Sequence, residues 1–109
     1  MARDKGLEAL LNEELADVRG LTQKAMFGGW AWLVNGNLLC AARSDGMLVR
    51  LGKENEHWAL EIPGVVLVVM RGRPMRGWVR AAPAVYVNDA LCQRLVEAAL
   101  EFNRSLPKK

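Results

Sequence analysis

The chain has 109 residues, of which 51% are hydrophobic and 25% charged, a composition that excludes a disordered chain and indicates one globular domain over residues 1–109. The longest apolar run, Val65 to Met70, is far too short for a membrane span, and no apolar signal segment follows Met1, so we expect a cytoplasmic protein without a membrane partner. A formal net charge of +3 is too small to indicate nucleic-acid binding without a local concentration of basic residues.

Leucine and valine residues recur at helical spacing near the N-terminus and predict a first helix over residues 4–19, which Gly20 can end. From Met26 the pattern changes to short strands, and these are separated by Asn35-Gly36 and Asp45-Gly46, the preferred pairs for two-residue hairpin loops. Three antiparallel strands are therefore expected in this part of the chain.

The two turns imply a pairing register, and the register assigns side chains to the two faces of the sheet. Pairing across the first turn places Trp32 opposite Leu39, and one face of the sheet is then apolar. The other face carries Trp30, Trp32, Arg43 and Arg50. Because it mixes tryptophan with arginine, this second face cannot be an ordinary dry core. A loop longer by one residue at either turn would exchange the faces.

Residues 53–60 are expected to form a short helix that ends before Pro63, and residues 65–70 a strand that is apolar on both sides. A turn over residues 72–74 then precedes a strand over residues 76–81. Alternation along that strand puts three large side chains on one side, Arg76, Trp78 and Arg80.

Asn88 is a suitable N-cap for a final helix that runs to about Ser105, and the tail over residues 106–109 is expected to be flexible. The elements follow the order α-β-β-β-α-β-β-α. This order predicts an α+β fold, a two-layer sandwich in which the helices lie on one face of an antiparallel sheet.

Three motifs resemble those of the TfoX N-terminal domain family, also called TfoX/Sxy. They are Met-Phe-Gly-Gly at residues 26–29, Val-Asn-Gly-Asn at residues 34–37 and Gly-Arg-Pro-Met-Arg-Gly-Trp-Val at residues 72–79. Residues 100–107 are similar too, so the resemblance spans nearly the whole chain. It implies an α+β domain with an antiparallel sheet and an association with bacterial regulators of natural competence. In those regulators a second, helical domain follows this one. The present sequence stops at Lys109, so we expect a stand-alone domain here.

No residue pattern indicates catalysis, a metal site or a cofactor, and the family supplies no catalytic residues to carry over. His57 is the only histidine and has no acidic or cysteine partner at ligand spacing. Ser44 and Ser105 are the only serines, and neither lies in a nucleophile motif. Cys40 and Cys92 form no C-x-x-C pair and are expected to be buried. We therefore expect a protein that is not an enzyme.

The strongest local signal is a run of arginines in the second half of the chain. Arg71, Arg73, Arg76 and Arg80 lie in a stretch that contains no acidic residue. Glycines beside Arg73 and Arg76 would allow backbone N–H groups and guanidinium groups to meet at an anion. A hairpin turn with solvated arginines accounts for the same residues.

The candidate binding surface combines these arginines with the tryptophans of the sheet. Its residues are Trp30, Trp32, Arg43, Arg50, Arg71, Arg73, Arg76, Trp78 and Arg80. Tryptophan and arginine are enriched anchors of protein interfaces, and the same combination stacks single-stranded bases while holding phosphates. A strand that is apolar on both sides suggests that part of this face is covered, as in a dimer. We expect a regulatory or interaction module that forms a homodimer or binds a protein partner, with direct DNA or RNA binding as the alternative.

Overall fold

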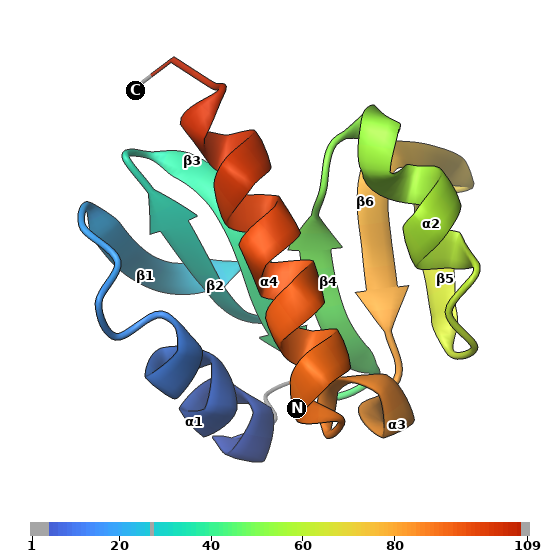
Figure 1. The fold of residues 1–109 in the computed structure, drawn as a ribbon, viewed down its shortest axis with the longest axis horizontal. Coiled ribbons are helices and arrows are strands. Elements are labelled where there is room, and N and C mark those ends of the chain that lie inside the picture. Colours follow the sequence, from blue (N-terminus) through green and yellow to red (C-terminus); the bar gives the residue numbers. More distant parts are fainter. Residues whose placement is uncertain (1–4, 27, 108–109) are drawn as a thin grey trace.

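The structure is a computed structural model that describes residues 5–26 and 28–107 (Figure 1). The elements are α1 Lys5–Glu14, β1 Leu21–Met26, β2 Gly29–Val34, β3 Asn37–Arg43, β4 Gly46–Arg50, the 3-10 turn η1 Lys53–Asn55, α2 Glu56–Leu60, β5 Val65–Met70, β6 Arg73–Ala81, α3 Pro83–Tyr86 and α4 Asp89–Arg104. The strands form one antiparallel sheet in the order β1-β2-β3-β4-β6-β5, so β1 and β5 are its edges.

The α+β class with an antiparallel sheet is confirmed, but the predicted single layer of helices on one face is wrong. Helix α4 crosses the middle of the sheet over β3 and β4, whereas α1 lies beside the β1 end and α2 packs against β5 and β6 (Figure 1). A sheet of six strands twists along its width, so helices at its two ends do not share the plane of the central helix.

Two elements differ from the predicted order, the additional strand β1 and the short helix α3. Residues 22–25 of strand β1 are all exposed, so its sequence shows no alternating apolar pattern that would predict a strand. The final helix agrees with its prediction: the side chain of Asn88 accepts a hydrogen bond from the Leu91 N–H at 3.2 Å and so caps α4. Within the predicted tail, the Pro107 carbonyl accepts from Asn37 Nδ2 at 2.9 Å, and residues 108–109 lie outside the described residues.

The first hairpin turns at Asn35-Gly36, as predicted, with positive φ angles of 53° and 82° at the two residues. The second hairpin closes one residue earlier than predicted, because Arg43 pairs with Gly46. This change shifts the pairing of β3 and β4 by two residues. A shift of two leaves every side chain of β4 on its predicted face.

A bulge in the first hairpin changes the faces of β2. Beyond the turn, Trp32 pairs with Cys40 instead of Leu39, so β3 contains one extra residue. Because side chains alternate along a strand, this single residue turns Trp30 and Trp32 over relative to the rest of the sheet.

The main core lies between the sheet and the helices. Leu11 of α1, Trp32 of β2 and Leu95 of α4 are all 0% exposed in this core. The Trp32 Nε1 donates to Asn12 Oδ1 at 3.0 Å, so its ring also ties α1 to the sheet. Cys40 and Cys92 are buried free thiols, as expected, and burial raises the pKa of both.

A smaller apolar cluster, the second cluster, lies on the opposite face of the sheet. It consists of the buried residues Ala31, Ala41, Leu48, Val68 and Trp78 and the partly buried residues Met26, Leu38, Met70 and Met75. Every member belongs to a strand, and no described helix contributes a residue to it. We call the strand surface around this cluster, to which no described helix contributes, the helix-free face.

Candidate binding surface

The structure divides the predicted surface into separate places. Trp32 is 0% exposed in the main core, and Trp30 is half-buried against the same core, with its Nε1 donating to Gln23 Oε1 at 2.7 Å. Trp78 instead belongs to the second cluster. The predicted common face of the three tryptophans is therefore wrong, and the physical reason is the bulge in β3 that turns β2 over.

Three residues of the predicted surface lie on the helix-free face: Trp78, Arg43 and Arg80. Trp78 is 9% exposed, so its ring is largely covered by its own chain. Asp45 Oδ2 accepts from Arg43 Nη2 at 2.9 Å and from Arg80 Nη1 at 3.1 Å. One carboxylate thus holds two arginines beside a hollow of about 220 Å³. Because all three side chains are partly exposed, solvent screens these pairs and they add little to stability.

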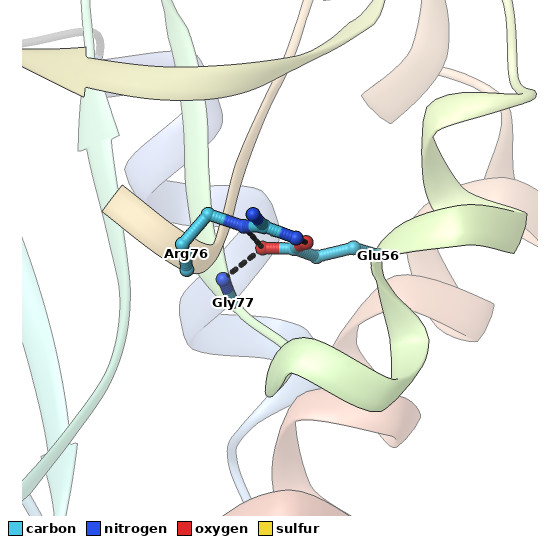
Figure 2. A network of polar contacts seen from close by, with 3 residues as sticks. All are labelled: Glu56, Arg76 and Gly77. Atoms are coloured by element: carbon cyan, nitrogen blue, oxygen red, sulfur yellow. Dashed lines mark hydrogen bonds and ion pairs between the residues drawn. The ribbon is translucent and has the colours of Figure 1, made fainter. Parts of the chain in front are cut away.

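Arg76 is held by Glu56, a residue that the sequence did not single out. Glu56 begins α2 and is only 5% exposed. Its Oε1 accepts from Arg76 Nη2 at 2.8 Å and Nε at 3.1 Å, and its Oε2 accepts from the Gly77 N–H (Figure 2). The Arg76 hydrogen bonds, followed by that of Gly77, hold the pKa of Glu56 below its ordinary value. A carboxylate from the chain itself therefore occupies the place predicted for an external anion.

Acid is expected to weaken this contact and, with it, the fold. The pKa of Glu56 is lowered in the folded chain, so the contact stabilises the fold at neutral pH. This contribution is lost as the pH falls from 4.5, the ordinary pKa of the group, towards its lower pKa in the folded chain. Glu56→Gln keeps the shape of the side chain but removes its charge. We expect a lower Tm at neutral pH and a flatter decrease of Tm on acidification, measured by circular dichroism.

The matched control for this prediction is Glu54→Gln, which removes an exposed carboxylate two residues earlier in the 3-10 turn. It should leave the acid dependence of the Tm close to that of the wild type. An acid dependence in Glu56→Gln as steep as that of the wild type would contradict a stabilising role for the contact.

A cleft of about 670 Å³ opens beside the Glu56–Arg76 contact, between the end of β4, the 3-10 turn, β6 and the C-terminal half of α4. Arg50 lies in its wall, with the guanidinium carbon 5.3 Å from the centre of the Phe102 ring. Basic residues of the lining are accompanied by Glu54 and Glu101. Because both signs of charge line the cleft, it does not form an anion site of the predicted kind.

Arg71 lies in the exposed turn between β5 and β6, and the exposed Arg73 is the first residue of β6. Neither makes an ion pair with any residue that the structure describes. Gly72 between them has no other atom within 4 Å of its side-chain position, so the turn projects into solvent. Within the run Arg71, Arg73, Arg76 and Arg80, these two guanidinium groups are therefore the ones without a carboxylate partner among the described residues.

Within the described residues, no group of three or more His, Cys, Asp and Glu side chains is arranged to hold a metal ion. His57 is exposed, and the Ser105 hydroxyl donates to the Phe102 carbonyl at 2.6 Å. The helices of residues 5–26 and 28–107 include none with the length and apolar character of a membrane span.

Comparison with protein families matches residues 13–103 to the TfoX N-terminal domain. Comparison with curated proteins and with solved structures found no match. The matched range runs from the end of α1 to the last turn of α4, so it includes the whole sheet and all three motifs on which the resemblance was based. The chain therefore belongs to the TfoX N-terminal domain family.

Proposed function

We propose that this chain is a non-enzymatic regulatory module that acts through protein–protein contacts, with a second copy of itself as its first partner. The association of its family with regulators of natural competence is consistent with this role. The observation that carries the proposal is the helix-free face, where an apolar cluster around Trp78 is bordered by arginines that are already paired within the chain.

The pairing of the arginines favours a protein partner over a nucleic acid. Arg43 and Arg80 share Asp45, and Arg76 is bound by Glu56. A protein that holds phosphates needs cations that can be released to them, and each internal carboxylate reduces that attraction. Base stacking also needs exposed rings, whereas Trp78 is 9% exposed.

Three of the groups that could support catalysis, Cys40, Cys92 and Ser105, have structural uses instead, which supports a non-enzymatic role. Both cysteine thiols are buried with raised pKa values, so neither is a reactive thiolate at neutral pH. The hydroxyl of Ser105 hydrogen-bonds a carbonyl near the end of α4. These residues lie on different elements and form no nucleophile–base pair.

A binding assay separates this proposal from nucleic-acid recognition. Fluorescence anisotropy with labelled single-stranded DNA, single-stranded RNA and duplex DNA should show no saturable binding at about 50 mM salt. The double change Arg71→Ala with Arg73→Ala removes two guanidinium groups that have no carboxylate partner among the described residues, and it should make no difference. Binding that weakens between about 50 and 200 mM salt and is reduced in the double variant would replace the proposal with the nucleic-acid alternative.

A further inference from the structure

The two edges of the sheet differ in how they are protected against pairing with another strand. Natural sheets protect their edges with charged side chains, proline, short strands or bulges. Strand β1 carries Lys24 among four consecutive exposed residues, so a charged side chain guards that edge. Strand β5 has the sequence Val-Val-Leu-Val-Val-Met, with no charge and no proline. Only β1 shows such protection by its side chains.

The backbone of β5 is also suitable for pairing, because the irregularity beside it belongs to β6. Leu67 pairs with Val79 and Val69 with Pro74, so a single residue of β5 stands opposite residues 75–78 of β6. The extra residues, including Gly77 with φ of 87°, therefore lie on the inner strand. The outer strand keeps an extended backbone, whose outward N–H and C=O groups have no partner strand among residues 5–26 and 28–107.

The exposed large apolar side chains gather at this same end of the sheet. Four such residues occur in the described chain: Leu60 at 39% exposed, Val66 at 45%, Val69 at 61% and Val87 at 65%. Val66 and Val69 belong to β5, and Leu60 ends α2, which packs against β5. Only Val87 lies elsewhere, after α3. An edge strand with exposed apolar side chains favours a partner that covers both its backbone and its side chains.

We propose that two copies of this chain associate by antiparallel pairing of their β5 strands into one continuous sheet. This inference rests on the proposed contact with a second copy and assigns that contact to the β5 edge instead of the helix-free face. Charge favours the antiparallel orientation, because Glu61 precedes β5 and Arg71 follows it. Antiparallel strands bring Arg71 of each copy towards the Glu61 end of the other, whereas parallel strands would bring the two arginines together.

Symmetry supports a second copy as the occupant. A two-fold axis between two β5 strands uses the same surface on both copies and closes the assembly as a dimer. The outer edges of the combined sheet are then the two β1 strands, which carry the exposed lysine. The pairing therefore covers the unprotected edges and ends in protected ones.

Sedimentation velocity from micromolar to millimolar concentration tests this inference with a matched pair of variants. The wild type is expected to be a concentration-dependent dimer. Val69→Lys places a charge on the β5 edge and should weaken the dimer at least about tenfold. Val87→Lys changes an equally exposed valine away from the sheet and should leave the dimer unchanged. Thermal unfolding at low concentration should confirm that both variants are folded.

Two outcomes would overturn the inference, and they have different consequences for the proposed function. If Val69→Lys and Val66→Lys both leave the dimer intact while Leu38→Lys on the helix-free face dissociates it, edge pairing is wrong but contact between proteins stands. If the wild type is monomeric up to millimolar concentration, edge pairing is wrong and a second copy is not the first partner. The nucleic-acid assay then decides whether the role in protein contact fails too.

Discussion

Replacing Trp32 by alanine is expected to lower the free energy of unfolding by about 3 to 5 kcal/mol, because removing a fully buried aromatic side chain leaves a cavity that the core fills only in part. The loss of its hydrogen bond should add little, since Asn12 is exposed and can bond to water instead. Small domains are stable by about 5 to 15 kcal/mol, so this loss removes a large share of the stability of the fold.

Trp30→Ala is the matched control, because Trp30 lies two residues away on the same strand but is only half-buried. Its removal should cost clearly less than that of Trp32. Urea unfolding followed by circular dichroism measures both values. Equal losses in the two variants would contradict the placement of Trp32 in the core. A Trp32→Ala protein that folds normally but does not dimerise would show that Trp32 belongs to the binding surface.

Local chemistry accounts for the parts of the fold that could be predicted from the sequence. Asn35-Gly36 marks the first hairpin because both residues accept a positive φ, and Asn88 marks the start of α4 because its side chain caps a free N–H. Both features depend on a few neighbouring residues. The family, too, could be recognised from short motifs, and the match over residues 13–103 agrees with it.

The faces of β2 could not be predicted, because they depend on one residue of β3 with no local signal. The extra residue in β3 is Leu39, in a run of apolar residues where any position could bulge. An error of one residue moves a whole strand to the other face. Trp30 and Trp32 were assigned to the binding surface for this reason alone.

The ion pairs of the predicted surface could not be predicted, because their partners lie far apart in the sequence. Glu56 and Arg76 are separated by 20 residues, and only the packing of α2 against β6 brings them together. Asp45 meets Arg80 across 35 residues in the same way. Counting charges along the chain detects an excess of arginine, but it cannot show which guanidinium groups already have a carboxylate. A short helix with an acid in its first turn, facing an arginine-rich strand, is the signal that would have suggested Glu56.

Gly52→Ala is the other substitution with a large expected effect, about 2 to 5 kcal/mol of destabilisation. Gly52 has φ of 85° and ψ of 153°, a conformation that is essentially restricted to glycine. A Cβ added there would lie 2.5 Å from Cδ1 of Phe102. The backbone cannot easily move away, because the Gly52 N–H donates to the Gly77 carbonyl at 3.1 Å.

Two further variants separate the backbone cost from the contact with the ring. Gly72→Ala also has positive φ but no neighbouring atom within 4 Å, so it should cost only about 1 to 2 kcal/mol. In a Phe102→Ala background the ring is absent, so Gly52→Ala should cost clearly less than in the wild type, with the backbone cost left. Urea unfolding of the four variants completes the cycle. If Gly52→Ala costs as much in the Phe102→Ala background as in the wild type, contact with the Phe102 ring is not the reason that this position requires glycine.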